Sequence, residues 1–197
     1  MKKVIAGCLM LMTVCTSFGQ SIQEAEVMLK GTVNSVLETL RLQDLDNTAR
    51  REKLIKVLDR AFKFDLMAKI SLGRSWQTLN DEQKKIFSEL FEQRLKDSYM
   101  EKLKLYSEET VTFEDPIMSK PRHLYIPTYL LSNGKRISML YKLYKISGSW
   151  RIYDLEIQGI SIISTYRSQF TQALKEGSFN ELIESMKAKV EEVPTEE

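Results

Sequence analysis

The dipeptide Asn133-Gly134 is the strongest local signal in this chain. Asn-Gly between two apolar segments favours a two-residue hairpin turn, because both residues accept the backbone conformation that such a turn requires. The turn sets the register by placing Ser132 opposite Lys135, and apolar residues then gather on one face of both strands. That face is predicted to carry Leu124, Ile126, Leu130, Ile137, Met139, Tyr141 and Leu143.

The length of the following turn decides which face of the next strand is buried. A two-residue turn would place Asp154 and Glu156 on the apolar face. A three-residue turn would instead place Tyr153, Leu155 and Ile157 there. Because a shift of one residue moves every side chain to the other face, burial favours the longer turn. The opposite face would then carry Trp150, Ile152, Tyr144 and Tyr129.

A short alternating segment at 110–113 adds another strand, which gives an antiparallel sheet of about four strands. Pro127 lacks a backbone N–H, so its strand is expected to lie at an edge or to contain a bulge. The fold class is therefore α+β, because helical periodicity surrounds these strands.

The helices begin at recognisable capping residues. Asn80 with Gln83, and Ser178 with Glu181, each form a capping-box pattern. Asp65 is the expected N-cap of a short helix that ends before Gly73. The apolar spacing predicts amphipathic helices at 22–42, 54–62, 65–72, 80–99, 161–174 and from 178 onward.

Gly159 and Ser161 mark the change from the last long strand to a helix. Glycine accepts backbone conformations closed to other residues, and the serine hydroxyl accepts hydrogen bonds from the first helical turn. The chain is therefore expected to return an apolar helix toward the sheet that it has just left.

The N-terminus has the features of a secretory signal peptide. Lys2 and Lys3 precede the apolar segment Val4–Val14, and Ser17-Phe18-Gly19 is a small-x-small cleavage site. The apolar segment is too short for a stable membrane anchor. We predict a signal peptide at 1–19, a single domain at 20–189 and a disordered acidic tail at 190–197.

Cys15 leaves a second possibility for the N-terminus, the lipid-attachment site of a bacterial lipoprotein. Cleavage after Gly19 is favoured, because Val14 stands where a small residue is expected. That cleavage removes both cysteines, which excludes disulfide and thiol chemistry from the mature chain. It also removes two of the 29 basic residues and leaves 27, equal to the 27 acidic ones. A neutral protein gives no reason to expect nucleic acid as a partner.

Few residues in the mature chain are suited to catalysis or metal binding. His123 is its one histidine, so a His/Cys metal site is not expected. Asp154 and Glu156 share a strand face and form a possible carboxylate pair, but a solvated or salt-bridged face is the favoured interpretation. A small α+β enzyme using Asp154 or His123 stays an alternative, as does an adaptor whose apolar groove binds a partner helix.

Two blocks of sequence carry a family resemblance. The first runs from Phe64-Asp65-Leu66-Met67-Ala68 through Leu72-Gly73-Arg74 and Trp76 to Asp81-Glu82-Gln83, Phe87, Phe91 and Tyr99. The second comprises Trp150, Tyr153-Asp154, Gly159-Ile160-Ser161 and Thr165-Tyr166-Arg167-Ser168-Gln169-Phe170. Together they resemble the MlaC (toluene-tolerance) family of periplasmic lipid-binding proteins.

The resemblance implies an α+β domain that encloses a deep hydrophobic pocket between sheet and helices. It implies a periplasmic, non-enzymatic and monomeric carrier of phospholipid, with no cofactor besides that cargo. Its expected partners are an outer-membrane lipoprotein complex and an inner-membrane ABC transporter with a lipid-binding ring subunit, which together maintain outer-membrane lipid asymmetry. Another apolar lipid, such as a hopanoid, is the alternative cargo.

Within this interpretation the acyl chains need apolar walls and no catalytic group. We expect the lipid-binding residues to be Leu66, Ile70, Trp76, Phe87, Phe91, Leu95, Met139, Tyr141, Leu143, Leu155, Ile163, Tyr166 and Phe170. Gly159 and Ser161 are expected to shape the turn rather than touch lipid. Arg167 is expected either to pair with Asp154 or to contact a partner.

Overall fold

The computed structural model describes residues 12–42, 44–103 and 109–191. Its helices are α1 (Met12–Arg41), α2 (Asn47–Ala61), α3 (Phe64–Leu72), the 3-10 helix η1 (Gly73–Thr78), α4 (Asp81–Leu103), α5 (Ile162–Glu176) and α6 (Phe179–Glu191). Its strands are β1 (Thr110–Phe113), β2 (Ile117–Lys120), β3 (His123–Ser132), β4 (Lys135–Ile146), β5 (Ser149–Ile157) and β6 (Ile160–Ser161). None of the described helices is both long and apolar enough to cross a membrane.

The strands form one antiparallel sheet in the order β1-β3-β4-β5-β6, with β2 also paired to β3. The α+β prediction is confirmed, and the expected count of about four strands is close to the six in the described chain. The additional strands, β2 and β6, have only four and two residues. The two residues of β6 are too few to show an alternating pattern, and the pairing of β2 with β3 is irregular between Met118 and Lys120.

The predicted hairpin at Asn133-Gly134 is confirmed, with Ser132 paired to Lys135 and Leu130 to Ile137. Both turn residues have positive φ angles, 49° and 73°, as a type I′ turn requires. This turn therefore places one face of β3 and β4 toward the helices, where Leu124, Ile126, Tyr141 and Leu143 are buried.

The turn before β5 differs from the prediction, because it contains two residues, Ser147 and Gly148, rather than three. Ile152 consequently lies opposite Leu143 on the covered face, and Trp150 is buried there too. The expectation that Trp150 and Ile152 lie on the outer face is therefore wrong. Trp150 donates a hydrogen bond from Nε1 to the Ser21 carbonyl oxygen of α1 at 2.8 Å, which explains its orientation.

A β-bulge at Tyr153 then changes the register by one residue, so that Asp154 pairs with Lys142. Beyond the bulge the predicted register is correct, and Leu155 and Ile157 lie on the covered face. Tyr153 does not lie on the covered face. Its ring contacts His123, which precedes Leu124 in β3 and lies on the outer face. The bulge allows residues on both sides of it to bury their apolar side chains.

Pro127 lies within β3, an interior strand, and not at an edge of the sheet. A proline is tolerated here because no strand pairs with β3 at this residue on the side of β1 and β2. β1 pairs with residues of β3 from Thr128 onward, and β2 pairs with residues up to Tyr125. Glu114, between β1 and β2, donates its backbone N–H to the Pro127 carbonyl at 2.9 Å. A missing donor at position 127 therefore breaks no strand pairing.

The predicted capping boxes are confirmed. Asn80 and Gln83 exchange hydrogen bonds of 3.0 and 2.8 Å at the start of α4, and Ser178 with Glu181 does the same before α6. Ser161 caps α5 through a 3.0 Å bond from Ser164 N–H. The prediction for Asp65 is wrong, because α3 begins at Phe64 and Asp65 lies in its first turn.

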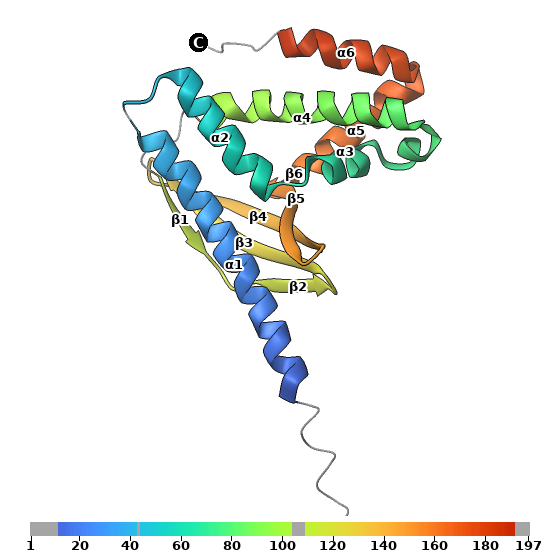
Figure 1. Cartoon of the computed structure of the whole chain (residues 1–197). Helices are drawn as coiled ribbons and strands as arrows, with labels where there is room; N and C mark the ends of the chain where they lie inside the picture. Colours follow the sequence, from blue (N-terminus) through green and yellow to red (C-terminus); the bar gives the residue numbers. More distant parts are fainter. Residues whose placement is uncertain (1–11, 43, 104–108, 192–197) are drawn as a thin grey trace, which may run out of the picture.

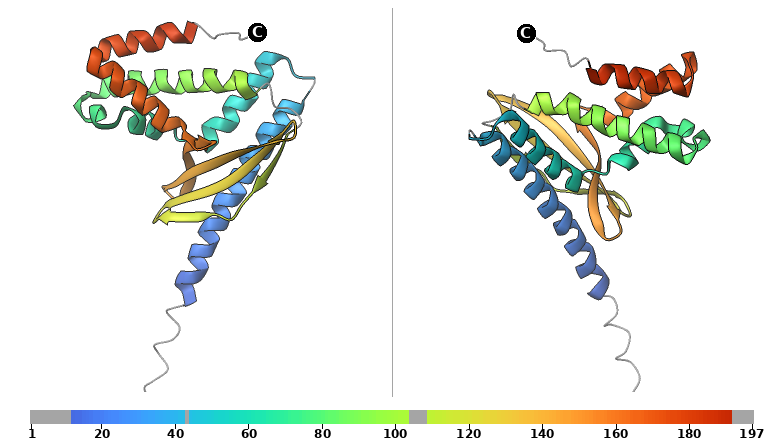
Figure 2. Two further views of the ribbon diagram at one scale, coloured as in Figure 1. Left: turned by 180° about the vertical axis from the view of Figure 1, so that it is seen from behind. Right: turned by 45° about the horizontal axis from the view of Figure 1, so that its top comes forward.

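The helices form two groups (Figures 1 and 2). Helices α1 and α2 pack together, and α1 crosses the sheet diagonally. Helix α4 packs on α3 and α6 and runs beyond the sheet, with α5 connecting this group to β5. The space bounded by α1, α2, α4 and the sheet is therefore framed by elements from both groups.

The predicted terminal segments fall partly outside the described residues. Residues 1–11 of the predicted signal peptide and 192–197 of the predicted tail are not described. The remainder of the signal peptide forms the beginning of α1, and Glu191 is the last residue of α6. Cleavage after Gly19 stays a prediction.

Candidate functional site: an apolar cavity between helices and sheet

A cavity of about 470 Å³ lies between the helices and the covered face of the sheet, and it is partly open to solvent. Its volume falls within the range of about 300–1,000 Å³ that is typical of ligand pockets. Most of its lining is apolar, and it receives residues from α1 to α5 as well as from the strands. The sequence therefore builds a ligand-sized space at the place where its two helical groups meet.

Helix α1 supplies one wall through Val33, Val36, Leu37 and Leu40. These residues are spaced by three, one and three positions, so they form one stripe on the helix. Thr32 also lines the cavity, and its hydroxyl donates to the Met28 carbonyl at 2.8 Å. Because this hydroxyl is already hydrogen bonded within the helix, the α1 wall is effectively apolar.

Strands β4 and β5 supply the opposite wall. Tyr141 pairs with Leu155 and Met139 with Ile157, and all four side chains line the cavity. Burial raises the pKa of the Tyr141 hydroxyl to about 12. The phenol therefore stays neutral at ordinary pH, and the sheet wall carries no charge at these positions.

The helices beyond the sheet close one end of the cavity. Phe64 and Met67 come from α3, Leu95 and Tyr99 from α4, and Ile162 from the start of α5. Burial, followed by the influence of Tyr166 and Asp154, raises the pKa of Tyr99 to about 12. Tyr99 therefore stays neutral at ordinary pH and adds no charge to this end of the cavity.

Lys96 is the one charged residue of the lining within the described chain. Its Nζ lies 2.5 Å from both Asp59 Oδ1 and Glu92 Oε1, and 5.0 Å from the centre of the Phe64 ring. Burial lowers the pKa of this ammonium, but the hydrogen bonds to Asp59 and Glu92 outweigh burial and the net shift is upward. Lys96 therefore stays charged, and its ammonium is paired with two carboxylates at the place where it borders Phe64 of the cavity wall.

Four of the residues predicted to bind lipid line this cavity: Leu95, Met139, Tyr141 and Leu155. The remaining predicted residues lie elsewhere. Phe87, Phe91, Leu143, Ile163, Tyr166 and Phe170 are buried in the core, and Leu66, Ile70 and Trp76 are half-buried around it.

Aromatic packing explains why several of these residues are core rather than wall. The Phe91 ring lies 5.2 Å from Tyr166 and 6.2 Å from both Phe87 and Phe170, and Phe87 lies 5.2 Å from Phe170. Rings at such separations fill the space between α4 and α5 with one another. The aromatic stripe of α4 thus joins helices, and the cavity begins farther along α4, at Leu95.

Val36 of α1, Leu58 of α2 and Phe62, directly after α2, also line the cavity, although the sequence did not predict them as part of its wall. Their amphipathic pattern was visible, but it did not reveal which part of the sheet they would face. Leu130 and Ile137 were assigned to the apolar face and also line the cavity. Hairpin register therefore identified more of the wall than the family motif did.

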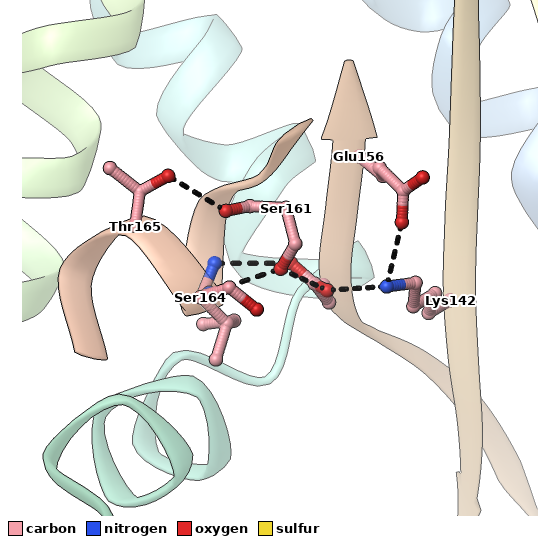
Figure 3. Close-up of polar contacts among 7 residues, drawn as sticks. Lys142, Glu156, Ser161, Ser164 and Thr165 are labelled. Atoms are coloured by element: carbon pink, nitrogen blue, oxygen red, sulfur yellow. Dashed lines mark hydrogen bonds and ion pairs between the residues drawn. The ribbon is translucent and has the colours of Figure 1, made fainter. Parts of the chain in front are cut away.

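Asp154 is a structural carboxylate. It is buried and accepts hydrogen bonds from Lys142 Nζ at 3.0 Å, Ser161 Oγ at 2.7 Å and the Ile163 N–H at 3.2 Å. Lys142 Nζ is also 3.0 Å from Glu156 Oε2 (Figure 3). The carboxylate joins β4, β5 and the start of α5, and both of its oxygens are already bonded.

His123 and Arg167 also have structural contacts. His123 Nδ1 lies 3.1 Å from the Pro121 carbonyl, and its ring packs at 4.7 Å on Tyr144. Arg167 donates two hydrogen bonds to the Ile70 carbonyl, at 3.0 and 2.7 Å, so it joins α5 to α3 and does not pair with Asp154. Among the described residues, no group of three or more His, Cys, Asp and Glu side chains is arranged to bind a metal ion.

Comparisons with known proteins agree with this architecture. The family model described as "MlaC protein" matches residues 30–188. The fold is similar to that of a phospholipid-binding protein from Ralstonia solanacearum, solved in complex with a phospholipid, with a TM-score of 0.77 and 21% identity. That match covers 86% of this chain and 99% of the other. No curated protein sequence matches the chain. The family match spans most of the sequence, and the chain therefore belongs to the MlaC family.

Proposed function

We propose that this protein binds the acyl chains of a phospholipid in the apolar cavity and carries the lipid through the aqueous periplasm. The observation that supports the proposal most directly is the cavity of about 470 Å³ with apolar walls from α1, β4 and β5. Membership of the MlaC family and the fold shared with a phospholipid-binding protein point to the same class of ligand.

The physical reason is the cost of exposing hydrocarbon to water. Burial of each CH₂ group is worth about 0.8 kcal/mol, so a bound acyl chain is stabilised by many kcal/mol relative to water. A carrier therefore needs an apolar space of sufficient length and a way to release the lipid. It needs no reactive group, and we propose that the protein is not an enzyme.

The wider role that we propose is shuttling between an outer-membrane lipoprotein complex and an inner-membrane ABC transporter that has a lipid-binding ring subunit. This role would require export, which the predicted signal peptide at 1–19 would provide, and a monomer that leaves each partner. It would help to maintain lipid asymmetry in the outer membrane.

Lipid extraction and native mass spectrometry of protein purified from its host test the proposal. We expect co-purified phospholipid, and uptake of labelled phospholipid from vesicles by the emptied protein. Recovery of a hopanoid would change the assigned cargo. Repeated recovery of empty protein with no uptake would reject the carrier function and favour a binding site for a partner helix.

The enzymatic alternative has less support. Asp154 is occupied by three hydrogen bonds from Lys142, Ser161 and Ile163, and His123 lies on the outer face of the sheet, away from the cavity lining. A general base needs a free acceptor within reach of its substrate.

A further inference from the structure

Tyr141 brings a hydroxyl group to the wall of the apolar cavity without a protein partner for it. The residue is 9% exposed and lies on the covered face of β4. No described residue forms a hydrogen bond with this hydroxyl, and burial is the cause of its raised pKa. Buried hydroxyl groups normally have a hydrogen-bond partner, because an unsatisfied donor costs free energy. A ligand that occupies the cavity can therefore supply the acceptor.

The other polar groups in and around the cavity differ from Tyr141. Thr128 Oγ1 and Glu109 Oε2 also lack partners within the described chain, but neither residue lines the cavity. Thr32 and Lys96 do line it, but their polar atoms are already bonded within the protein. Tyr141 combines burial, a place in the lining and an unpaired hydroxyl.

The exposure of the sheet wall increases toward the end of β5. Tyr141 and its partner Leu155 are both 9% exposed. The next pair on this face, Met139 and Ile157, is half-buried. Gln158 follows β5, is exposed and still lines the cavity, so the cavity meets solvent at this point. Gln158 is three residues beyond Leu155, which at about 3.3 Å per residue places the Tyr141 pair about 10 Å inside the opening.

The hydrogen-bond acceptors of a phospholipid are its phosphate and its ester carbonyls. A phosphate beside Tyr141 would lack a counter-charge, since Lys96, the one cation of the lining in the described chain, already pairs with two carboxylates. Burial of an unpaired charge costs far more than burial of a neutral group. An ester carbonyl is neutral and lies between the headgroup and the acyl chains, so it suits a buried donor that is close to the opening.

We propose that the Tyr141 hydroxyl donates a hydrogen bond to an ester carbonyl of the bound lipid, and that the cavity therefore prefers ester-linked chains to hydrocarbon chains without a carbonyl group. This inference rests on the proposed function. In this arrangement the headgroup reaches the opening at Gln158, and the acyl chains stay between the apolar walls.

The test compares two lipids that differ only in their carbonyl groups. The emptied protein is incubated with vesicles that contain equal amounts of two phosphatidylglycerols, one with ester-linked oleoyl chains and one with ether-linked oleyl chains. The bound lipids are extracted and counted by mass spectrometry. We expect the ester lipid to be enriched about two- to tenfold over the ether lipid, the difference that one neutral hydrogen bond gives.

Two variants assign the preference to one hydroxyl group. Tyr141→Phe removes the hydroxyl and keeps the ring, so the ester enrichment should disappear while the ether lipid is taken up as by wild type. Tyr129→Phe makes the same change on the outer face of β3, where the ring packs against Arg136, and should keep the wild-type ratio. Urea unfolding of the emptied proteins at pH 7 adds a second readout. Tyr141→Phe should be at least as stable as wild type, because its hydroxyl has no protein partner to lose.

An ester enrichment that is lost in Tyr141→Phe and kept in Tyr129→Phe would support the inference. The same ratio in wild type and Tyr141→Phe would overturn it and leave the carrier function intact. A loss of stability in the emptied Tyr141→Phe variant would also overturn it, because the hydroxyl would then be bonded within the protein. No uptake of either lipid by wild type would overturn both this inference and the carrier function.

Discussion

Tyr141 and Leu155 are direct partners across β4 and β5, and both side chains line the apolar cavity. This pair lies just beyond the bulge at Tyr153, so its position depends on the one-residue change of register there. The wall of the cavity is therefore set by sheet register, and single substitutions on neighbouring positions of the same strand should have very different effects.

Met139→Trp should reduce the amount of lipid bound, because the larger ring would occupy the cavity next to Ile157. Stability should change little, since the added atoms enter space that the protein itself leaves empty. Leu140→Trp is the matched control, because residue 140 points to the outer face of the same strand. Lipid stoichiometry by mass spectrometry checks this, and equal losses in both variants would show that the cavity does not hold the lipid.

Tyr141→Phe should make the protein less sensitive to alkali. The Tyr141 pKa rises from 10 to about 12 in the folded state, so folding favours the neutral phenol. Its contribution is complete below pH 10 and is lost as the pH rises from 10 to 12, by about 3 kcal/mol in total. Urea unfolding at several pH values should show a smaller decrease in unfolding free energy for the variant. If the unfolding free energies of wild type and variant decreased equally between pH 10 and 12, the raised pKa of Tyr141 would be contradicted.

Phe91→Ala should destabilise the protein by about 3–5 kcal/mol, because it removes a fully buried ring that packs on Phe87, Tyr166 and Phe170. Phe91→Leu should cost less, since it retains most of the apolar volume. Urea unfolding measures both. If Phe91 formed part of the lipid-binding wall, Phe91→Ala would lose lipid while keeping wild-type stability.

Asp154→Ala should destabilise the protein by about 1–3 kcal/mol, because it leaves the Ile163 N–H and Ser161 hydroxyl without their acceptor. Glu156→Ala is the comparison, since Glu156 also pairs with Lys142 but is more exposed. It should cost less than about 1 kcal/mol. Thermal unfolding measures which variant loses more stability. A large loss in Glu156→Ala with little loss in Asp154→Ala would contradict the structural role of Asp154. At temperatures where Asp154→Ala is folded, its lipid content should match that of wild type.

The features that could be predicted from sequence are those set by neighbouring residues. Asn133-Gly134 determines its hairpin through its own backbone preferences, and Asn80, Ser161 and Ser178 cap helices through bonds that span three residues. The α+β class follows from these local patterns, and the expected family agrees with the match over residues 30–188.

The cavity wall was harder to predict because it depends on contacts between distant segments. Phe91 and Leu95 lie on the same stripe of α4, yet Phe91 packs in the core and Leu95 lines the cavity. Periodicity marks both as apolar and inward, and only the placement of α5 relative to the sheet separates them. The bulge at Tyr153 could not be predicted for a similar reason. Trp150 and Ile152 have one parity and Leu155 and Ile157 the other, and a regular strand buries only one of these two pairs.

The two-residue turn at Ser147-Gly148 and the extra residue at Tyr153 have opposite effects on where Leu155 falls. With the two-residue turn and no bulge, Asp154 would lie opposite Tyr141 and Glu156 opposite Met139, in the places that Leu155 and Ile157 occupy. The single unpaired residue at Tyr153 therefore keeps two carboxylates out of the wall of the apolar cavity.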